Sequence, residues 1–257
     1  MSVARALTIA TSDSGGGAGI QADLKAFAAA GAHGMSVLVA LTAQNTHAVT
    51  AVHELPADFV RAQLEAVFDD IGVDAAKTGM LFSRALIETV ADEMRGRRVP
   101  LVVDPVMVAS SGAKLLQDDA VDTLVTHLFP LATVVTPNAK EAEALVGAGS
   151  RREQAERIVG LGAGAVIVTG GHGDPVDHLY DGTTHVEIPV QRHDIAATHG
   201  AGCTHSATLA ACLAHGQPLD AAARAAARAA GEAVRHGLAE LGEGEGPVDV
   251  LNVKGAD

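Results

Sequence analysis

Residues 3–31 have the sequence VARALTIATSDSGGGAGIQADLKAFAAAG, and this stretch decides the fold. The short apolar run 3–10 predicts a buried strand, and the spacing of apolar residues over 20–30 predicts a helix that ends at Gly31. A strand that leads through a tight turn into a helix is the repeating unit of a parallel α/β sheet. Four glycines between residues 15 and 19 are more than such a turn requires, which favours a backbone that lies against a ligand.

The same alternation continues along the chain. Further strands are predicted at 35–41, 75–78, 101–103, 131–136 and 166–169, and further helices at 57–69, 84–94, 204–214 and 219–238. Asp181-Gly182 lies between two strand-like runs within 180–190 and predicts a hairpin. The sequence therefore predicts an α/β fold: a three-layer α/β/α sandwich with a mostly parallel central sheet, a small β-hairpin excursion and a single domain over residues 1–257.

Composition excludes several classes of protein. Hydrophobic residues make up 48% of the 257 residues against 19% charged, which excludes wholesale disorder. The net charge of −13 argues against a nucleic-acid partner, and the 2% aromatic content argues against base-stacking surfaces. We find no apolar run of membrane-spanning length, no secretory leader and only two cysteines. We expect a cytoplasmic protein with a small-molecule ligand.

Residues 198–206, THGAGCTHS, lead directly into an apolar helix and are the main candidate for chemistry. Gly200, Ala201 and Gly202 can direct successive N–H groups at one anion, assisted by the helix dipole. The dipole is also expected to lower the pKa of Cys203, so that its thiol accepts a proton near neutral pH. An anion site beside a base suits phosphoryl transfer to a hydroxyl. The alternative is a helix cap with a structural cysteine, a description that fits Cys212 well.

Residues 136–141, TPNAKE, have two interpretations. Asn138 as N-cap and Glu141 three residues later form a capping box, which by itself accounts for both. Since a predicted strand precedes them, the same pair also faces the ligand edge of the sheet, where both can hold the hydration shell of Mg²⁺. Asp104, at the end of its strand and followed by Pro105, is placed in the same way.

Other polar residues carry weaker signals. The amide of Gln44 offers a donor and an acceptor, which matches the edge of a heterocycle with an amine beside a ring nitrogen. Asp23 is interpreted as a solvated acid of the first helical turn. Lys77 and the 12 histidines, including His199 and His205, show no metal-ligand spacing. The glycine-rich turn matches neither the dinucleotide-binding nor the P-loop motif.

Eight segments occur in an order that is specific when taken together. They are SDSGGGAGIQADLKAF, ALTAQNT, AKTGML, VVDPVM, TPNAKEAEAL, TGGH, THGAGCTHSA and GEGPV, spanning residues 9–248. In this combination the chain resembles the hydroxymethylpyrimidine/phosphomethylpyrimidine kinase family of thiamine biosynthesis, within the ribokinase-like superfamily.

The resemblance implies an enzyme, usually a homodimer, that uses ATP and Mg²⁺ to phosphorylate 4-amino-5-hydroxymethyl-2-methylpyrimidine and then its monophosphate. It implies an anion hole at Gly200, Ala201 and Gly202, with Cys203 as the base where sugar kinases of the superfamily have Asp. The pyrimidine pocket would comprise Gln44, Asp23, Ala18, Met80 and Val106. The nucleotide and phosphate side would comprise Asp104, Asn138, Glu141 and Thr169, with Glu141 and Asp104 holding Mg²⁺ through water.

Two positions depart from the family pattern. Thr169 and Glu243 stand where the family usually has lysines near the phosphates. A potassium ion or Lys140 is a candidate for the missing positive charge. Two alternatives stay open: a pyridoxal kinase of the same fold, and a non-catalytic pyrimidine-binding homologue. The retained Cys203 and Glu141 argue against loss of activity, and Cys203 argues against a sugar kinase.

Overall fold

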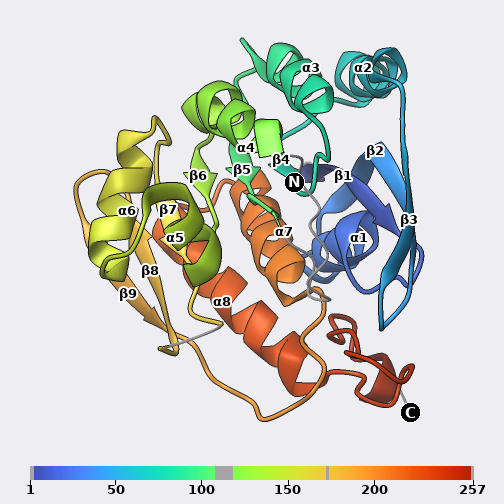
Figure 1. The fold of residues 1–257 in the computed structure, drawn as a ribbon, viewed down its shortest axis with the longest axis vertical. Coiled ribbons are helices and arrows are strands. Elements are labelled where there is room, and N and C mark those ends of the chain that lie inside the picture. The colour runs from blue at the N-terminus through green and yellow to red at the C-terminus, as the bar shows by residue number, and fades with distance from the viewer. Residues whose placement is uncertain (1–2, 108–117, 172–173, 256–257) are drawn as a thin grey trace.

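One nine-stranded sheet runs through the computed structural model, which describes residues 3–107, 118–171 and 174–255. The strand order is β3-β2-β1-β4-β5-β6-β7-β8-β9, so that β3 and β9 lie at opposite ends of the sheet (Figure 1). The parallel strands are β1 (Arg5–Asp13), β2 (His33–Gln44), β4 (Ala75–Thr78), β5 (Leu101–Val103), β6 (Val134–Val135) and β7 (Val166–Val168). The antiparallel strands are β3 (Val49–Glu54), β8 (Val176–Tyr180) and β9 (His185–Pro189).

Helices cover both faces of this sheet, each over its own apolar core (Figure 1). One face packs against α1 (Gly19–Ala29), α7 (Ala201–Ala214) and α8 (Leu219–Arg235). The other packs against α2 (Ala57–Ala66), α3 (Arg84–Met94), α4 (Asp118–Thr123), α5 (Ala139–Val146) and α6 (Arg151–Gly160). Short π- and 3₁₀-turns complete the chain: η1 (Val67–Ile71), η2 (Leu124–Leu128), η3 (Phe129–Leu131) and η4 (Val253–Gly255). The predicted three-layer α/β/α architecture is confirmed.

The predicted hairpin is also confirmed, as β8 and β9. Its turn is held by Asp181, whose carboxylate accepts hydrogen bonds from the N–H groups of Thr183 and Thr184. A second hairpin, β2–β3, was not predicted. Strand β3 is exposed over most of its length, so it lacks the apolar run by which buried strands are recognised.

The parallel strands bring their carboxyl ends to one edge of the sheet, because every crossover returns the chain in the same direction. Asp13 ends β1, Gln44 ends β2, and Asp104 and Thr169 directly follow β5 and β7. Residues far apart in the sequence therefore gather at this edge. None of the described helices combines the length and apolar character that crossing a membrane requires.

Candidate active site

The N-terminus of α7 is pressed against the glycine-rich loop that follows β1. Gly200 is the N-cap of α7 and has a left-handed backbone with φ 87°. A Cβ atom at Gly200 would lie 1.8 Å from the carbonyl oxygen of Gly17, and one at Gly17 would lie 2.3 Å from the His199 ring. Only glycine allows this approach of two backbones. Both glycine-rich segments identified in the sequence thus form one structural unit.

The first turn of α7 leaves N–H groups available to an anion. Ala201 donates its N–H to the carbonyl of Thr198 at 3.0 Å, and Thr204 donates to the carbonyl of Gly200 at 2.8 Å. Among the residues that the structure describes, none accepts a hydrogen bond from the N–H of Gly202 or of Cys203. Both lie at the positive end of the helix dipole, where an anion is stabilised. The geometry is that of an anion-binding helix terminus.

Cys203 has a different electrostatic environment from the one expected. Burial raises the pKa of its thiol to about 12, and this outweighs the nearby charge of Lys77 and the N–H of Gly19, both of which lower it. The carboxylates of Asp23 and Asp104 add to the increase. The expectation of a lowered thiol pKa is wrong, because it weighed the helix dipole without the cost of burying a thiolate. The resting thiol is neutral at pH 7.

Asp23 is not the solvated acid expected from its place on α1. Its carboxylate is fully buried and accepts hydrogen bonds from Lys77 Nζ at 2.9 and 3.0 Å and from Thr8 Oγ1 at 2.6 Å. Burial alone lowers the pKa of Lys77, but Asp23, Cys203 and Asp104 together outweigh it, and the pKa of Lys77 lies above its usual value. Since Asp23 has no accessible surface, the structure does not place it on the wall of a pocket.

Asp104 is near both the buried Lys77–Asp23 ion pair and Glu141 of α5. Its Oδ2 accepts a hydrogen bond from Ser206 Oγ at 2.8 Å and lies 4.0 Å from Lys77 Nζ. Burial, and second the charge of Asp104, raise the pKa of Glu141 to about 8. Two carboxylates that destabilise each other's charge, both offering hard oxygen ligands, fit a divalent cation such as Mg²⁺.

No complete metal site is preformed there. Within the described ranges, no three His, Cys, Asp or Glu side chains come together as ligands. An ion at Asp104 and Glu141 would therefore complete its shell with water and substrate oxygens, as Mg²⁺ usually does.

The capping box at the start of α5 is confirmed. Asn138 Oδ1 accepts hydrogen bonds from the N–H groups of Lys140 and Glu141, and Glu141 Oε2 accepts one from the N–H of Asn138 at 2.9 Å. Thr169 lies beside this turn, since its N–H donates to the carbonyl of Pro137 at 2.9 Å. The structure thus brings Thr169, Asn138 and Glu141 together, while Lys140 is exposed.

The other end of the site lies at β1 and β2. The Nε2 atom of Gln44 lies 3.4 Å from His199 Nε2, which lies 3.1 Å from Asp13 Oδ2. The three remaining pocket residues are placed by their backbones. Ala18 donates its N–H to Asp13, Met80 accepts a hydrogen bond from Thr11 Oγ1 at its carbonyl, and Val106 donates its N–H to the carbonyl of Asp104.

The segment 242–246 packs on the loop after β2. Gly244 donates its N–H to Thr46 Oγ1 at 3.1 Å, and Glu245 accepts a hydrogen bond from Thr198. Glu243 is 95% exposed and lies 3.9 Å from His47 Nε2. His172, the last residue of the TGGH segment, lies outside the described residues.

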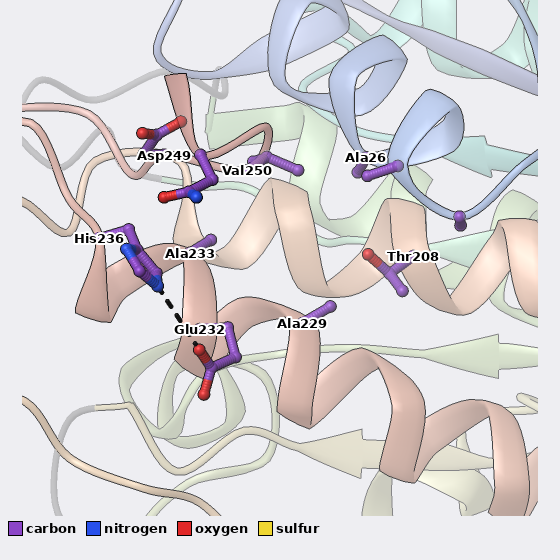
Figure 2. A pocket seen from close by; sticks show the side chains of 11 residues that line it. Ala26, Thr208, Ala229, Glu232, Ala233, His236, Asp249 and Val250 are labelled. Carbon is purple, nitrogen blue, oxygen red and sulfur yellow. Dashed lines mark ion pairs between the residues drawn. The ribbon is translucent and has the colours of Figure 1, made fainter. Parts of the chain in front are cut away.

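A cavity of about 320 Å³ lies elsewhere, between α1, α8 and the C-terminal segment. Figure 2 shows alanines along much of its wall, with Glu232 and His236 as an ion pair at its rim. None of the site residues predicted from the sequence lines it. The candidate active site is the edge of the sheet and not this cavity.

Sequence reasoning missed Lys77, Asp13 and His199. A lysine in a short apolar strand of a parallel sheet signals a buried ion pair, because such strands are covered on both faces. An Asp directly before a glycine-rich turn signals a carboxylate that holds the turn's N–H groups. Asp13 does so for Gly15, Gly17 and Ala18. His199 had no comparable signal, since its partners lie more than 150 residues away.

Comparison with known proteins gives three findings of the same kind. The family model described as phosphomethylpyrimidine kinase matches residues 13–249. A protein of Rhizobium meliloti named hydroxymethylpyrimidine/phosphomethylpyrimidine kinase is 50% identical over 253 residues, which cover 95% of each chain. The thiamine biosynthesis bifunctional protein ThiED of Geobacter sulfurreducens is 51% identical over 95% of this chain, which spans 51% of that longer protein.

A solved structure agrees with the fold over almost the whole chain. The ADP complex of Bacillus subtilis pyridoxal kinase superimposes with a TM-score of 0.89 at 39% identity, covering 98% of this chain and 99% of that one.

Proposed function

The chain belongs to the phosphomethylpyrimidine kinase family, and we propose that it is the ATP-dependent kinase of 4-amino-5-hydroxymethyl-2-methylpyrimidine and of its monophosphate in thiamine biosynthesis. The observation that carries this proposal is the start of α7. Its free N–H groups are flanked along the chain by His199, which contacts the Gln44 amide, and by Ser206, which donates to Asp104 beside Glu141. An anion site between a cation site and a heterocycle-binding amide is what phosphoryl transfer to such a substrate requires.

The residues divide the work as follows. The N–H groups of Gly202 and Cys203, with that of Gly200, bind the transferred phosphoryl group and stabilise the charge on its oxygens. Cys203 replaces Ala201 in this set, because the N–H of Ala201 donates to the carbonyl of Thr198. Asp104 and Glu141 hold Mg²⁺, assisted by Asn138, and Thr169 lies beside them on the nucleotide side. Mg²⁺ neutralises phosphate charge when bound.

Cys203 lies in the first turn of α7, beside the anion site, and its thiolate form can accept the hydroxyl proton. Because its resting thiol is neutral, Cys203 first releases its own proton to solvent, and only the small thiolate fraction then accepts the hydroxyl proton. Lys77 favours the thiolate, and Asp23 keeps Lys77 in place. We therefore reassign Asp23 from a substrate contact to a positioning residue behind Cys203.

Gln44, Ala18, Met80 and Val106 bind the pyrimidine. Gln44 accepts from the amine and donates to the adjacent ring nitrogen, a complementary pair. Lys140 is the exposed cation on the phosphate side that compensates for Thr169 and Glu243, and a requirement for K⁺ stays a prediction.

We propose further that the protein works as one domain and as a homodimer in the cytoplasm. One sheet that connects all the strands supports the single domain. The exposed edge strand β3, with Leu41 and Val52 among the exposed apolar side chains of its hairpin, supports pairing with a second copy. Free Cys203 and Cys212 agree with a reducing compartment. Light scattering on the purified protein tests the dimer.

Turnover with purified enzyme, ATP and Mg²⁺ tests the function. We expect the aminopyrimidine to be converted first to the monophosphate and then to the diphosphate, both separable by anion-exchange chromatography. Pyridoxal is the necessary competitor, because the fold matches a pyridoxal kinase so closely. A higher kcat/KM for pyridoxal than for the aminopyrimidine would replace the proposed substrate, and ligand binding without turnover would replace the proposed activity.

A further inference from the structure

Four polar side chains at the pyrimidine end of the site form a chain of contacts. Asp13 Oδ2 lies 3.1 Å from His199 Nε2, and the same nitrogen lies 3.4 Å from Gln44 Nε2. On the other side, Gln44 Oε1 lies 3.1 Å from Thr42 Oγ1. The amide of Gln44 is therefore held between a histidine and a threonine.

Asp13 determines where the proton of His199 lies. Burial opposes ionisation of Asp13, but hydrogen bonds from His199 and from the N–H groups of Ala18 and Gly15 outweigh it, and the pKa of Asp13 lies below its usual value. An ionised carboxylate is only an acceptor, so the nitrogen that faces it must carry a proton. His199 Nε2 is therefore a donor, whether or not its ring is charged.

This proton conflicts with an amide nitrogen at the same place. Gln44 Nε2 is also only a donor, and two N–H donors 3.4 Å apart do not form a hydrogen bond. The Gln44 oxygen in that position would instead be a second acceptor of the His199 N–H, which it would share with Asp13 in a three-centre hydrogen bond. The two ends of an amide have nearly the same shape, so the surrounding donors and acceptors decide its orientation.

Thr42 favours the same orientation. Its hydroxyl has a single proton, and it lies 3.0 Å from the carbonyl oxygen of Ser12 and 3.1 Å from Gln44 Oε1. With the amide oxygen there, two acceptors share one hydroxyl proton, which is a weaker arrangement for a hydroxyl than one acceptor and one donor. With the amide turned by 180°, Thr42 donates to Ser12 and accepts from Gln44, and every group in the chain has a partner.

We propose that His199, held by Asp13, fixes the amide of Gln44 with its oxygen on the His199 side and its nitrogen on the Thr42 side, and so determines which heterocycles the site accepts. This inference deepens the proposed function and rests on it. The free lone pair of the amide oxygen and the second amide N–H then face the ligand in a fixed order. A ring with an amine next to an acceptor nitrogen matches this order, with the amine on the His199 side. The 4-oxo counterpart, with its carbonyl next to a ring N–H, presents donor and acceptor in the reverse order and is rejected.

The test compares kcat/KM for 4-amino-5-hydroxymethyl-2-methylpyrimidine and for its 4-oxo counterpart. His199→Met removes the donor, and we expect it to lower the ratio of the two kcat/KM values at least tenfold, mainly through KM, because the amide becomes free to turn. His199→Gln keeps an N–H near the position of Nε2 and should keep most of the wild-type ratio. His215→Met is the matched control, since that histidine lies beyond the other end of α7 and contacts the carbonyl of Ala30.

A purely structural role for His199 predicts another result. Loss of packing lowers kcat/KM for both substrates alike, so an unchanged ratio in His199→Met would overturn the proposal. If that variant does not fold, Thr42→Val decides in its place, because it removes the other partner of the amide and should lower the ratio in the same way. A wild-type enzyme that phosphorylates neither pyrimidine would refute the proposed function itself. A functional enzyme without amino-over-oxo preference would refute this inference alone.

Discussion

Lys77 Nζ lies 2.9 Å from Asp23 Oδ2, and both side chains are completely buried between the sheet and helices α1 and α7. An ion pair this deep gains little net stability, because desolvation of both charges offsets their attraction. Its position suggests another use. The charge of Lys77 acts on Cys203 and on Asp104. The buried pair therefore influences the electrostatic environment of the candidate active site without being exposed in it.

We predict that Lys77→Met destabilises the protein by about 3–5 kcal/mol, because it leaves Asp23 charged and buried without its partner. The double variant Lys77→Met/Asp23→Leu should recover most of this loss. Urea unfolding of both variants provides the measurement. Equal stability of the single and double variants would mean that Asp23 is not ionised in the folded protein.

The contact between Gly200 and Gly17 gives a second prediction. Gly200→Ala adds a Cβ atom 1.8 Å from the Gly17 carbonyl oxygen at a φ of 87°. The two loops must separate, and we expect kcat to fall by roughly 100-fold, the usual scale for displacing reacting groups. Gly216→Ala is the matched control, since Gly216 has a φ of +76° with nothing within 4 Å of the added atom. It should cost about 1 kcal/mol in stability and leave kcat unchanged.

The sheet and its ligand edge follow from the sequence because buried parallel strands and turn residues leave strong local signals. The runs at 75–78 and 101–103 coincide with β4 and β5, and the capping box of Asn138 and Glu141 forms as its spacing predicts. Strand β3 escaped prediction for the opposite reason, since its exposed residues do not need to be apolar.

The electrostatics of the site do not follow from the sequence in the same way. The helix dipole at Cys203 is a local property and can be inferred from a motif, whereas the groups that shift its pKa include Asp23 and Gly19 of α1 and Lys77 of β4, all far away in the sequence. The partner of Lys77 is 54 residues away, and no spacing rule connects them. The same holds for Asp13 and His199, which meet only when the sheet has formed.

Glu141 leads to a prediction on pH and Mg²⁺. Its pKa is raised to about 8, so protonation of Glu141 stabilises the folded state relative to the unfolded one. This contribution is present in full below about pH 4.5 and is lost above pH 8. Without Mg²⁺ we therefore expect the free energy of unfolding to fall, by at most about 1.4 kcal/mol per pH unit from this group, between those values. Mg²⁺ needs the ionised carboxylate, so its apparent affinity should rise about tenfold per pH unit up to pH 8 and then level off.

Thermal unfolding at several pH values, with and without MgCl₂, measures this effect. Glu141→Gln is the appropriate comparison, because Gln preserves the capping box but does not titrate. Its response to Mg²⁺ should be weak and independent of pH. Stabilisation of the wild type by Mg²⁺ to the same extent at pH 6 and pH 9 would contradict the assignment of Glu141 as the group that holds the cation.

Cys203 allows a direct test of the thiol chemistry. With a pKa of about 12, the thiol should react slowly with iodoacetamide at pH 7, and the rate should rise about tenfold per pH unit through pH 9, because only the thiolate reacts. The Cys212→Ala background leaves Cys203 as the only cysteine to follow by mass spectrometry. In the same background Cys203→Ala should lower kcat by about 100-fold with a small change in the pyrimidine KM, as expected for a positioned proton acceptor. A rate of alkylation that is already maximal at pH 7 would show that the thiol pKa is low, as the helix dipole alone predicts. A kcat of Cys203→Ala near that of the wild type would show that the thiol takes no part in the mechanism.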